Sequence, residues 1–571
     1  MKERFLHVVL TVFLSLMGLS ASAYDFEADG LYYTITSTSD LTVSVSGLAD
    51  PSRVELVIPN VVVYKSKSLL VTSIDEEAFA NTNIESISVP SSVIKIGNKA
   101  FQECSNLKVV NLSEGISYLG SNCFSGCSHL SSIELPTTLK YVPSYTFSDC
   151  TELSQCILHE NIKAIYESAF KNSGIEIINI PNSCDTIGTS AFADAANLKH
   201  VVLPSALRSI SERCFSGCQK LQDLSLPQSI CYINDYAFSG CISLKELQLP
   251  TSLKCLGNNV LYGDSLIKKL VIPDSVTKIG FYNYAHLKSI TFGASLSGLP
   301  FWYKYYNYDI SCKDYSRVYK TMQSYFQSDP LYFPGNYSLY YEDNLCNELE
   351  EVIIADSKEE FRMRAFQKVL IDQHDRHHFS EYLYPPFSNC DIKRFYVGRP
   401  LIDIKEFYCT SPHGIKGEQG KEGHIAFLEI AGECTEIPYF YQRVDTLVIG
   451  ENITKFDVDN IYTDSIKAIL CKCANPPGLE NYSNILTSTY TDAIVYVPQG
   501  TLAVYQAADG WKNFWNIEEY DTTSTGIANI SDPLPDKIIY NLQGHKLSKP
   551  QKGINIINGK KVLINLNSAT L

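Results

Sequence analysis

One short phrase recurs from Val71 to about Phe292 at a nearly fixed interval. Its clearest copy, LQDLSLPQSICYINDYAFSGC, runs from Leu221 to Cys241, and Leu244 opens the next copy. The aromatic residue of each copy follows the previous one by 22 or 23 residues, at Phe79, Phe101, Phe124, Phe147, Phe170, Phe192, Phe215 and Phe238. A constant period of this length indicates a repeat architecture in which every copy adopts the same local structure.

The length of one copy limits what the chain can fold into. A single copy buries too few apolar side chains to offset the entropy lost on its own ordering, so the copies must stack and share one core. The period predicts a leucine-rich repeat solenoid, mainly β with short helical and turn segments. Such a stack offers a broad surface without a large central cleft, which favours binding a macromolecule over enclosing a small substrate.

Each copy contains two predicted strands. The segment Leu-x-x-Leu-x-Leu predicts a short strand with its apolar residues inward, and a proline that cannot donate to the sheet ends it in most copies. These prolines are Pro90, Pro136, Pro181, Pro204, Pro227, Pro250 and Pro273. A second apolar pair, such as Ile230 and Ile233, predicts a strand on the opposite side, after which the Ala-Phe pair packs into the core and turns the chain.

The outward positions of the first strand form one predicted sheet face, which is nearly neutral. Its centre is apolar at Ile157, Ile177 and Val202, and exposed apolar groups ringed by polar ones are typical of a binding patch. The candidate partner-binding residues are therefore Gln155, Ile157, Ile177, Asn179, His200 and Val202. The alternative is an ordinary surface with scattered β-branched residues.

Five cysteines share one position, three residues after the repeat phenylalanine: Cys104, Cys127, Cys150, Cys218 and Cys241. Ser173 and Ala195 fill the same position in other copies, which indicates a slot for a small buried side chain. Stacked copies would hold these sulfurs in parallel, whereas a disulfide needs Cβ atoms turned towards each other at about 3.8 Å. We therefore predict mostly free thiols in this ladder, although 18 cysteines would ordinarily favour disulfides if the chain were exported.

Residues 1–23 have the pattern of a secretory signal peptide. Lys2 and Arg4 form the basic region, Val8 to Leu19 the apolar run, and Ala21-Ser22-Ala23 the cleavage site. We therefore expect a secreted or cell-surface protein that begins at Tyr24; the alternative is a buried N-terminal strand. No later apolar stretch reaches about 20 residues, so no transmembrane helix is predicted.

Changes of pattern divide the rest of the chain. Residues 24–70 alternate apolar and polar side chains and predict an N-terminal β cap, and the regular repeats occupy 71–299. A tyrosine-rich insertion at 300–345 is either a recognition surface or a local core. Degenerate repeats follow at 346–521, then a polar linker at 522–535 and a small β module of three short strands at 536–571.

Two shorter signals lie within the degenerate repeats. Ser357-Lys-Glu-Glu360 is a capping box and predicts a helix that runs to about His378. The segment from Ala493 to Phe514 predicts a strand, a short helix and an aromatic cover, which would form a C-terminal cap.

The charge of the chain restricts its partners. The net charge of −15 and the lack of any Lys/Arg block argue against binding nucleic acid or an anionic membrane. A protein or a neutral glycan is the favoured partner.

Little in the sequence points to catalysis. His374-Asp375-Arg-His377-His378 places two histidines on one helix face, but Asp replaces the Glu of a zinc protease and no third ligand follows at a recognised spacing. The segment is better interpreted as the solvated end of an amphipathic helix. Cys471-Lys-Cys473 is too closely spaced for an unstrained disulfide and lacks a second pair for zinc. We expect no metal, no cofactor and no enzyme, since nucleophile elbows, phosphate loops and dinucleotide fingerprints are also missing.

The repeat phrase resembles a known family. Its form Ile-x-x-x-Ala-Phe-x-x-Cys-x-x-Leu-x-x-Leu-x-Leu-Pro, from Ile233 to Pro250, is similar to the BspA-like leucine-rich repeats of bacterial surface proteins. The similarity covers roughly Val54 to Asp521. The segment Val497-Pro-Gln-Gly500, followed by Tyr505 to Trp511, also resembles that family.

The C-terminal tail carries a second resemblance. Tyr540-Asn-Leu-Gln-Gly544 and the segment Lys552 to Lys560 are similar to C-terminal sorting domains of Gram-negative surface proteins. Together the resemblances imply surface display and adhesion to host matrix proteins or to other cells, although the family has no shared binding residues to carry over. We therefore predict a non-enzymatic solenoid that binds a protein or glycan, with a surface hydrolase or a structural spacer as alternatives.

Overall fold

The structure is a computed structural model, and it describes the chain in segments. These are residues 24–280, 286–298, 303–306, 349–362, 366–370, 380–384, 390–402, 424–438, 440, 443–520, 539–540, 546–547, 553–557 and 560–564. The predicted signal peptide, most of the tyrosine-rich insertion and the histidines at 374–378 lie outside them. The chain forms two compact units, Met1–Leu287 with Phe333–Leu345 and Lys288–Tyr332 with Cys346–Leu571, and each is described by itself.

The first unit begins with the predicted strands of residues 24–70. They are β1 (Phe26–Ala28), β2 (Leu31–Ser37), β3 (Thr42–Leu48), β5 (Val61–Tyr64) and β6 (Lys67–Ile74). β1, β2 and β3 pair antiparallel, and β6 lies parallel between β3 and β8 (Lys95–Ile96). The N-terminal strands therefore cover the first edge of a repeat sheet, which protects it from pairing with another chain.

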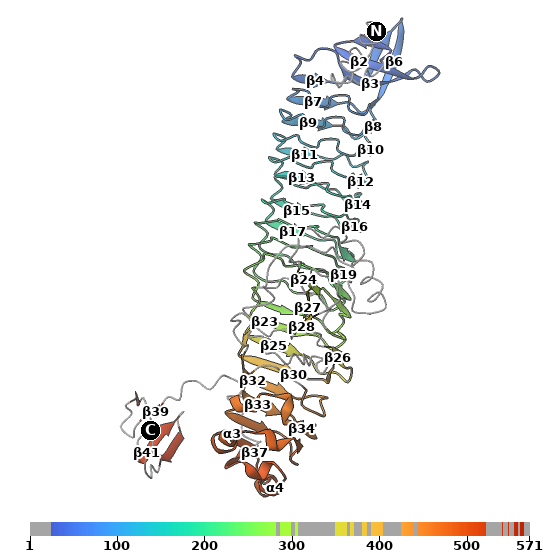
Figure 1. Ribbon diagram of the computed structural model, residues 1–571. Helices are drawn as coiled ribbons and strands as arrows, with labels where there is room; N and C mark the ends of the chain where they lie inside the picture. Colours follow the sequence, from blue (N-terminus) through green and yellow to red (C-terminus); the bar gives the residue numbers. More distant parts are fainter. Residues whose placement is uncertain are drawn as a thin grey trace, which may run out of the picture. The chain divides into compact units, whose positions relative to one another are not determined.

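The repeats build two stacks of short parallel strands, which lie on opposite sides of this unit (Figure 1). The first strand stack contains β4 (Glu55–Val57), β7 (Ser86–Val89), β9 (Val109–Leu112), β11 (Ser132–Glu134), β13 (Gln155–Ile157), β15 (Ile177–Asn179), β17 (His200–Val202) and β21 (Lys269–Val271). β4 already pairs in register with β7, so the stack begins at Glu55.

The second strand stack consists of two-residue strands. After β8 it contains β10 (Tyr118–Leu119), β12 (Tyr141–Val142), β14 (Ala164–Ile165), β16 (Thr186–Ile187), β18 (Ser209–Ile210), β19 (Tyr232–Ile233), β20 (Cys255–Leu256) and β22 (Lys278–Ile279). In each, the second residue is buried and the first faces outward in most copies. The predicted repeat solenoid is confirmed, with two strands in most copies; in the first stack Asp223 forms only an isolated bridge with His200, and the described copy that contains Glu246 has no strand.

The repeat phenylalanines form a continuous column in the core. All eight side chains from Phe79 to Phe238 are fully buried. Consecutive ring centroids lie 5.2 to 5.9 Å apart, with interplanar angles of 1° to 23°. Each ring is thus buried by packing against the rings of the neighbouring copies, so a single copy is not stable on its own.

The backbone at each phenylalanine makes the corner that the sequence predicts. Residues two positions before and two after the ring adopt positive φ; for Phe101 these are Lys99 at 55° and Glu103 at 57°. This conformation turns the N–H groups of Lys99, Phe101 and Glu103 towards the next copy, where they donate to Ser121, Cys123 and Ser125 at 2.8, 2.9 and 2.7 Å. The corner therefore satisfies buried backbone groups between copies rather than within one.

The ladder cysteines make an equivalent contact through their side chains. Each thiol donates to the carbonyl of the phenylalanine in the preceding copy, at 3.0 to 3.2 Å. The pairs are Cys104 with Phe79, Cys127 with Phe101, Cys150 with Phe124, Cys218 with Phe192 and Cys241 with Phe215. The predicted free thiols are therefore hydrogen-bond donors that link neighbouring copies.

The second unit contains a parallel sheet built from the predicted degenerate repeats. Its order is β23 (Ser289–Phe292), β25 (Glu351–Ile354), β30 (Arg394–Val397), β32 (His424–Ile430), β33 (Arg443–Ile449), β35 (Ala468–Cys471), β37 (Ile494–Pro498) and β38 (Asn516–Tyr520). β29 (Asp391–Ile392) also pairs with β32. Two smaller parallel pairs are β26 (Phe361–Arg362) with β31 (Leu401–Ile402) and β34 (Lys455–Asp457) with β36 (Gly478–Glu480).

The helix predicted from Ser357 to about His378 is wrong in the described residues. β26 and β27 (Phe366–Leu370) occupy this stretch, and β27 pairs with β24 (Tyr303–Tyr306) and β28 (Ser380–Tyr384). The Ser357 hydroxyl accepts from the N–H of Glu359, only two residues ahead, at 3.2 Å. Burial of Phe361 and the pairing of β26 with β31 therefore outweigh the local helix signal, which contributes only about 1 kcal/mol.

The predicted C-terminal cap is present as a strand, a short helix and an aromatic cover. After β37 come α4 (Leu502–Ala507) and η5 (Trp511–Asn513), and the chain ends the sheet as β38. Tyr505 and Trp511 are fully buried, and they donate to the carbonyls of Cys473 at 2.9 Å and Pro477 at 2.7 Å. These two side chains close the apolar end of the sheet without leaving a buried polar atom unpaired.

The remaining short elements are η2 (Val458–Asn460), η3 (Thr463–Ser465), η4 (Tyr482–Asn484) and α3 (Thr487–Asp492). Beyond residue 538 the chain forms β39 (Ile539–Tyr540), β40 (Lys546–Leu547), β41 (Gly553–Ile557) and β42 (Lys560–Ile564), an antiparallel sheet with one strand more than predicted. Among the described residues, no helix has the length and apolar character needed to span a bilayer.

Candidate functional site

The predicted partner-binding residues lie on three consecutive strands of the first strand stack. Ile157 ends β13, Ile177 opens β15 and Val202 ends β17, and their side chains are 65%, 54% and 57% exposed. The register of β15 and β17 pairs Ile177 with His200 and Asn179 with Val202. The structure therefore brings these residues onto one open face, as predicted, together with the exposed Gln155.

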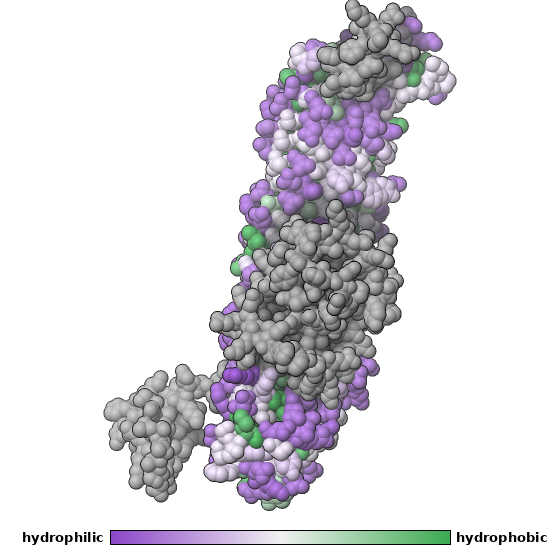
Figure 2. Space-filling model, viewed as in Figure 1, coloured by the Kyte–Doolittle hydropathy of each residue, from purple (hydrophilic) through white to green (hydrophobic). Residues whose placement is uncertain are grey.

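Strand alternation explains why apolar side chains are held in water here. The residue between each outward pair is buried: Cys156 in β13, Ile178 in β15 and Val201 in β17. A shift of register by one residue would expose these side chains, so burial of the inward residue fixes which side chains face outward. Figure 2 shows hydrophobic side chains only in small separate spots on the visible described surface, which is otherwise hydrophilic to neutral.

Two ion pairs between neighbouring copies lie beside the first strand stack. Lys108 lies 2.8 Å from Glu85, and Lys199 lies 2.7 Å from Glu176. The hydrogen bond and charge of Lys199 lower the pKa of Glu176. Such exposed pairs add little stability. The apolar centre of this face, at Ile157, Ile177 and Val202, itself carries no charged side chain.

A cluster of tyrosines on the second strand stack was not found from the sequence. Tyr118 opens β10, Tyr141 opens β12 and Tyr166 follows β14, and their side chains are 49%, 45% and 40% exposed. The rings of Tyr141 and Tyr166 stack with centroids 5.7 Å apart. The usable signal for Tyr118 and Tyr141 was the residue that precedes the buried second-strand residue of each copy, a position that is aromatic in only some copies; Tyr166 lies one residue beyond the buried Ile165.

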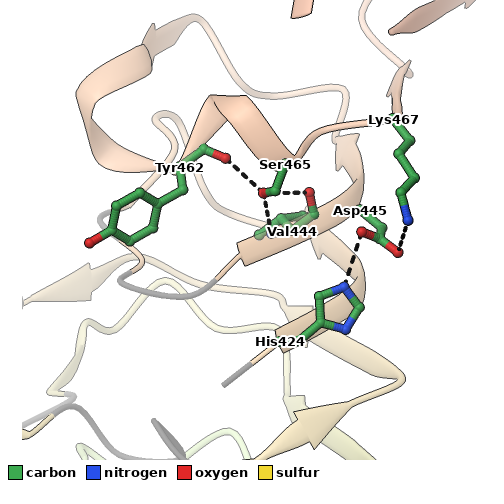
Figure 3. Close-up of polar contacts among 6 residues, drawn as sticks. All are labelled: His424, Val444, Asp445, Tyr462, Ser465 and Lys467. Atoms are coloured by element: carbon green, nitrogen blue, oxygen red, sulfur yellow. Dashed lines mark hydrogen bonds and ion pairs between the residues drawn. The ribbon is translucent and has the colours of Figure 1, made fainter. Parts of the chain in front are cut away.

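A histidine and an aspartate meet on the second unit (Figure 3). The Nε2 atom of His424 in β32 lies 3.0 Å from Oδ1 of Asp445 in β33, and Lys467 Nζ lies 2.8 Å from Oδ2. Burial raises the pKa of Asp445, but the hydrogen bonds and charges of Lys467 and His424 outweigh this and lower it overall. The carboxylate therefore stays ionised and joins two strands of the sheet.

This pair does not form a nucleophilic triad with the nearby serine. The Ser465 hydroxyl accepts from the N–H of Val444 at 3.0 Å and has the carbonyls of Tyr462 and Val444 as acceptors at 2.9 and 3.2 Å. Figure 3 shows Ser465 joined to Tyr462 and Val444, and His424 joined to Asp445, with no contact drawn between Ser465 and His424. Because the histidine contacts the aspartate and not the hydroxyl, the arrangement lacks the base-to-nucleophile contact that acyl transfer requires.

The buried cysteines Cys150, Cys156 and Cys473 are poorly suited to nucleophilic chemistry. Burial raises the pKa of Cys150, raises that of Cys156 to about 12 and raises that of Cys473 to about 11. A thiol is reactive as its thiolate, so these groups are inert near neutral pH. The Cys473 thiol donates to the carbonyl of Gly450 at 3.0 Å, and it therefore serves the fold in the same way as the ladder thiols.

One copy of the repeat places an acid in the cysteine slot. Asp264 follows Leu261 by three residues, and its side chain is 3% exposed. Neither carboxyl oxygen has a hydrogen-bond partner at full bonding geometry among the described residues. Burial raises the pKa of Asp264 to about 8, and the nearby backbone amides of Cys241 and Gly240 offset this only in part.

The described segments contain no candidate metal-binding site. No group of three or more His, Cys, Asp or Glu side chains there is arranged to hold a metal ion. The predicted histidine cluster at 374–378 falls outside those segments, so the structure does not bear on it.

Comparison with known proteins identifies the repeats. The model of the BspA-type leucine-rich repeat region matches residues 72–199 and 185–308, with six copies. No curated protein matches the chain significantly.

Several solved structures are similar to the chain at low identity. A leucine-rich repeat protein from Bacteroides ovatus is 22% identical, with 87% of this chain and 100% of that chain covered and a TM-score of 0.41. A leucine-rich cell surface protein from Faecalibacterium prausnitzii is 18% identical, with 59% and 96% covered and a TM-score of 0.34. The pneumococcal vaccine antigen PcpA is 19% identical, with 67% and 95% covered and a TM-score of 0.40.

Proposed function

Because residues 72–308 belong to the BspA-type leucine-rich repeat family, we propose that the chain is an exported surface protein that binds a partner through its first strand stack. The partner class is a host matrix or cell-surface protein or a glycan, and the function is adhesion or recognition. The export signal at residues 1–23 and the sorting-like tail at 536–571 support display outside the cell.

The observation that carries the proposal is the exposure of three aliphatic side chains on consecutive copies. Ile157, Ile177 and Val202 are each more than half exposed on one open face. Binding energy concentrates in a few residues at the centre of an interface, where surrounding contacts exclude water. Gln155, Asn179 and His200 lie beside them on the same strands and supply the polar rim.

Simultaneous substitution of Ile157, Ile177 and Val202 by alanine tests the proposal. Affinity for a partner found in a screen of matrix proteins and glycans should fall by at least about tenfold, because each lost side chain removes buried apolar contact worth about 1 kcal/mol or more. Circular dichroism should be unchanged, since all three side chains point into solvent. The matched control replaces Val109 and Val271, which are exposed on the same stack outside the centre. Equal affinity of the triple variant and the wild type would exclude this face.

The two alternatives predict different observations. A hydrolase built on the histidines at 374–378 would retain zinc through purification and lose it on addition of a chelator. A structural spacer would capture no partner in a pull-down. We propose a binding protein without catalytic activity, a role that the open strand stack and the lack of a triad at His424 support.

A further inference from the structure

The second strand stack carries a charge opposite to that of the whole chain. Its outward residues and the residues just before them include Lys95, Lys140, Lys163, Arg208, Lys254 and Lys278. Among the described copies, the acidic residue found at either of these two positions is Asp185, just before β16. These positions are therefore mostly basic although the chain has a net charge of −15 and no Lys/Arg block; the acids Glu167, Glu212 and Asp235 lie two residues beyond the buried strand residue of their copies.

Aromatic side chains lie among these lysines on consecutive copies. We call Lys95, Tyr118, Lys140, Tyr141, Lys163 and Tyr166 the tyrosine–lysine strip. Lys95 Nζ lies 5.3 Å from the centre of the Tyr118 ring. Tyr141 pairs in register with Ala164, whose small side chain is buried, and the Tyr141 ring stacks on that of Tyr166.

The two central lysines, Lys140 and Lys163, form no ion pair among the described residues, although Asp185 follows Lys163 in the same position of the next copy. The N–H of Lys163 donates to the carbonyl of Lys140 at 2.7 Å, so the two residues lie directly one above the other. Neither forms an ion pair with any described residue, whereas Lys99 lies 2.8 Å from Glu77. The nearby acids Glu167 and Asp185 instead accept hydrogen bonds from Tyr145 and Thr186 at 2.8 Å. An anion from outside the chain is the natural partner for such lysines.

From this arrangement we propose that the tyrosine–lysine strip binds an anionic polysaccharide. The lysines would pair with its carboxylate or sulfate groups, and the electron-rich tyrosine faces would stack on the weakly positive C–H groups of its sugar rings. The strip repeats with each copy, about 4.8 Å apart, so it can follow a linear polymer of repeating charge. This surface is separate from Ile157, Ile177 and Val202, so either site can fail without the other.

The test measures binding of the full chain to immobilised polysaccharides by biolayer interferometry. The probes are heparin, hyaluronan with carboxylates only, dextran sulfate with sulfates only, and neutral dextran. We expect binding to heparin and to at least one of hyaluronan and dextran sulfate in 50 mM NaCl, weakened in 300 mM NaCl, and none to dextran. Preference for hyaluronan would identify carboxylates as the ligand groups, and preference for dextran sulfate would identify sulfates.

Two variants and one control assign the binding to the strip. Lys140→Gln with Lys163→Gln should weaken heparin binding by at least about tenfold and reduce its salt dependence. Tyr118→Ala with Tyr141→Ala should weaken it while keeping the salt dependence. The control Lys108→Gln with Lys199→Gln removes lysines that glutamates already neutralise, and its affinity should stay within about twofold.

Three results would overturn the proposal. The first is the absence of polysaccharide binding at low salt. The second is equal heparin affinity of the Lys140/Lys163 variant and the control. The third is tighter binding to poly-L-glutamate than to every polysaccharide, which would identify an acidic protein as the occupant. Thermal melting of each variant confirms folding, and the substituted side chains are exposed except for the half-buried Lys199 of the control.

Discussion

Asp264 provides the sharpest test of the ladder, because it replaces a thiol with an acid at a buried slot. The pKa of the Asp264 carboxyl is about 8 in the folded chain, against an ordinary 3.8. Between about pH 4 and pH 8 the carboxyl is therefore protonated in the folded chain and ionised in the unfolded chain. Stability should therefore fall as pH rises, by about 1.4 kcal/mol per pH step and by about 5 kcal/mol across the interval. Below about pH 4 both states hold the proton, and this slope disappears.

Asp264→Cys removes the slope, since it gives the slot the thiol that other copies carry. Urea unfolding followed by circular dichroism at pH 5, 6, 7 and 8 compares the variant with the wild type and with Asp223→Asn, an exposed control. The stability advantage of Asp264→Cys should grow with pH by about 1.4 kcal/mol per step. Parallel pH profiles of wild type and Asp264→Cys would refute the reasoning, because the carboxyl would then be ionised in the fold or already solvated.

Further predictions concern the core and the cap. Phe147→Ala, in the middle of the phenylalanine column, should destabilise the chain by about 3 to 5 kcal/mol by urea unfolding, and the exposed Tyr141→Ala by less than about 1 kcal/mol. Iodoacetamide at pH 8 should modify the ladder thiols only after denaturation; labelling of Cys150 in the folded chain, detected by mass spectrometry, would contradict their burial. Tyr505→Phe should cost about 1 kcal/mol through the lost hydrogen bond to Cys473, whereas an unchanged unfolding midpoint would show that the contact is not maintained in solution.

The regular repeats could be predicted closely because each signal in them recurs. Periodicity places every phenylalanine in the same environment, so the inward and outward positions of β13, β15 and β17 follow from one copy. The outward exposure of Ile157 and Val202 is thus readable from the phrase itself. The same reasoning finds the cysteine slot, since side chains that alternate between Cys, Ser and Ala share small volume and burial.

The features that were missed depend on comparisons between copies or on distant contacts. The tyrosine–lysine strip consists of residues that recur about 23 positions apart along the chain. The net charge of the whole chain does not reveal it, because acidic residues elsewhere outnumber these lysines. Positive φ at Lys99 and Glu103 is imposed by stacking, because neither residue type favours it. The helix predicted after Ser357 failed because β26 pairs with β31, some 40 residues further along the chain. Such pairing cannot be derived from a local capping pattern.

Spin-label distances along the first strand stack test the stacking of the copies most directly. Labels at Ser132 and at Asp223, Glu246 or Lys269 occupy equivalent outward positions separated by four, five and six copies. In-register stacking predicts distances that grow steadily, by about 4.8 Å per copy, to about 19, 24 and 29 Å before allowance for the label arms. Distances that do not increase with the number of intervening copies would contradict the solenoid and every surface assigned to it.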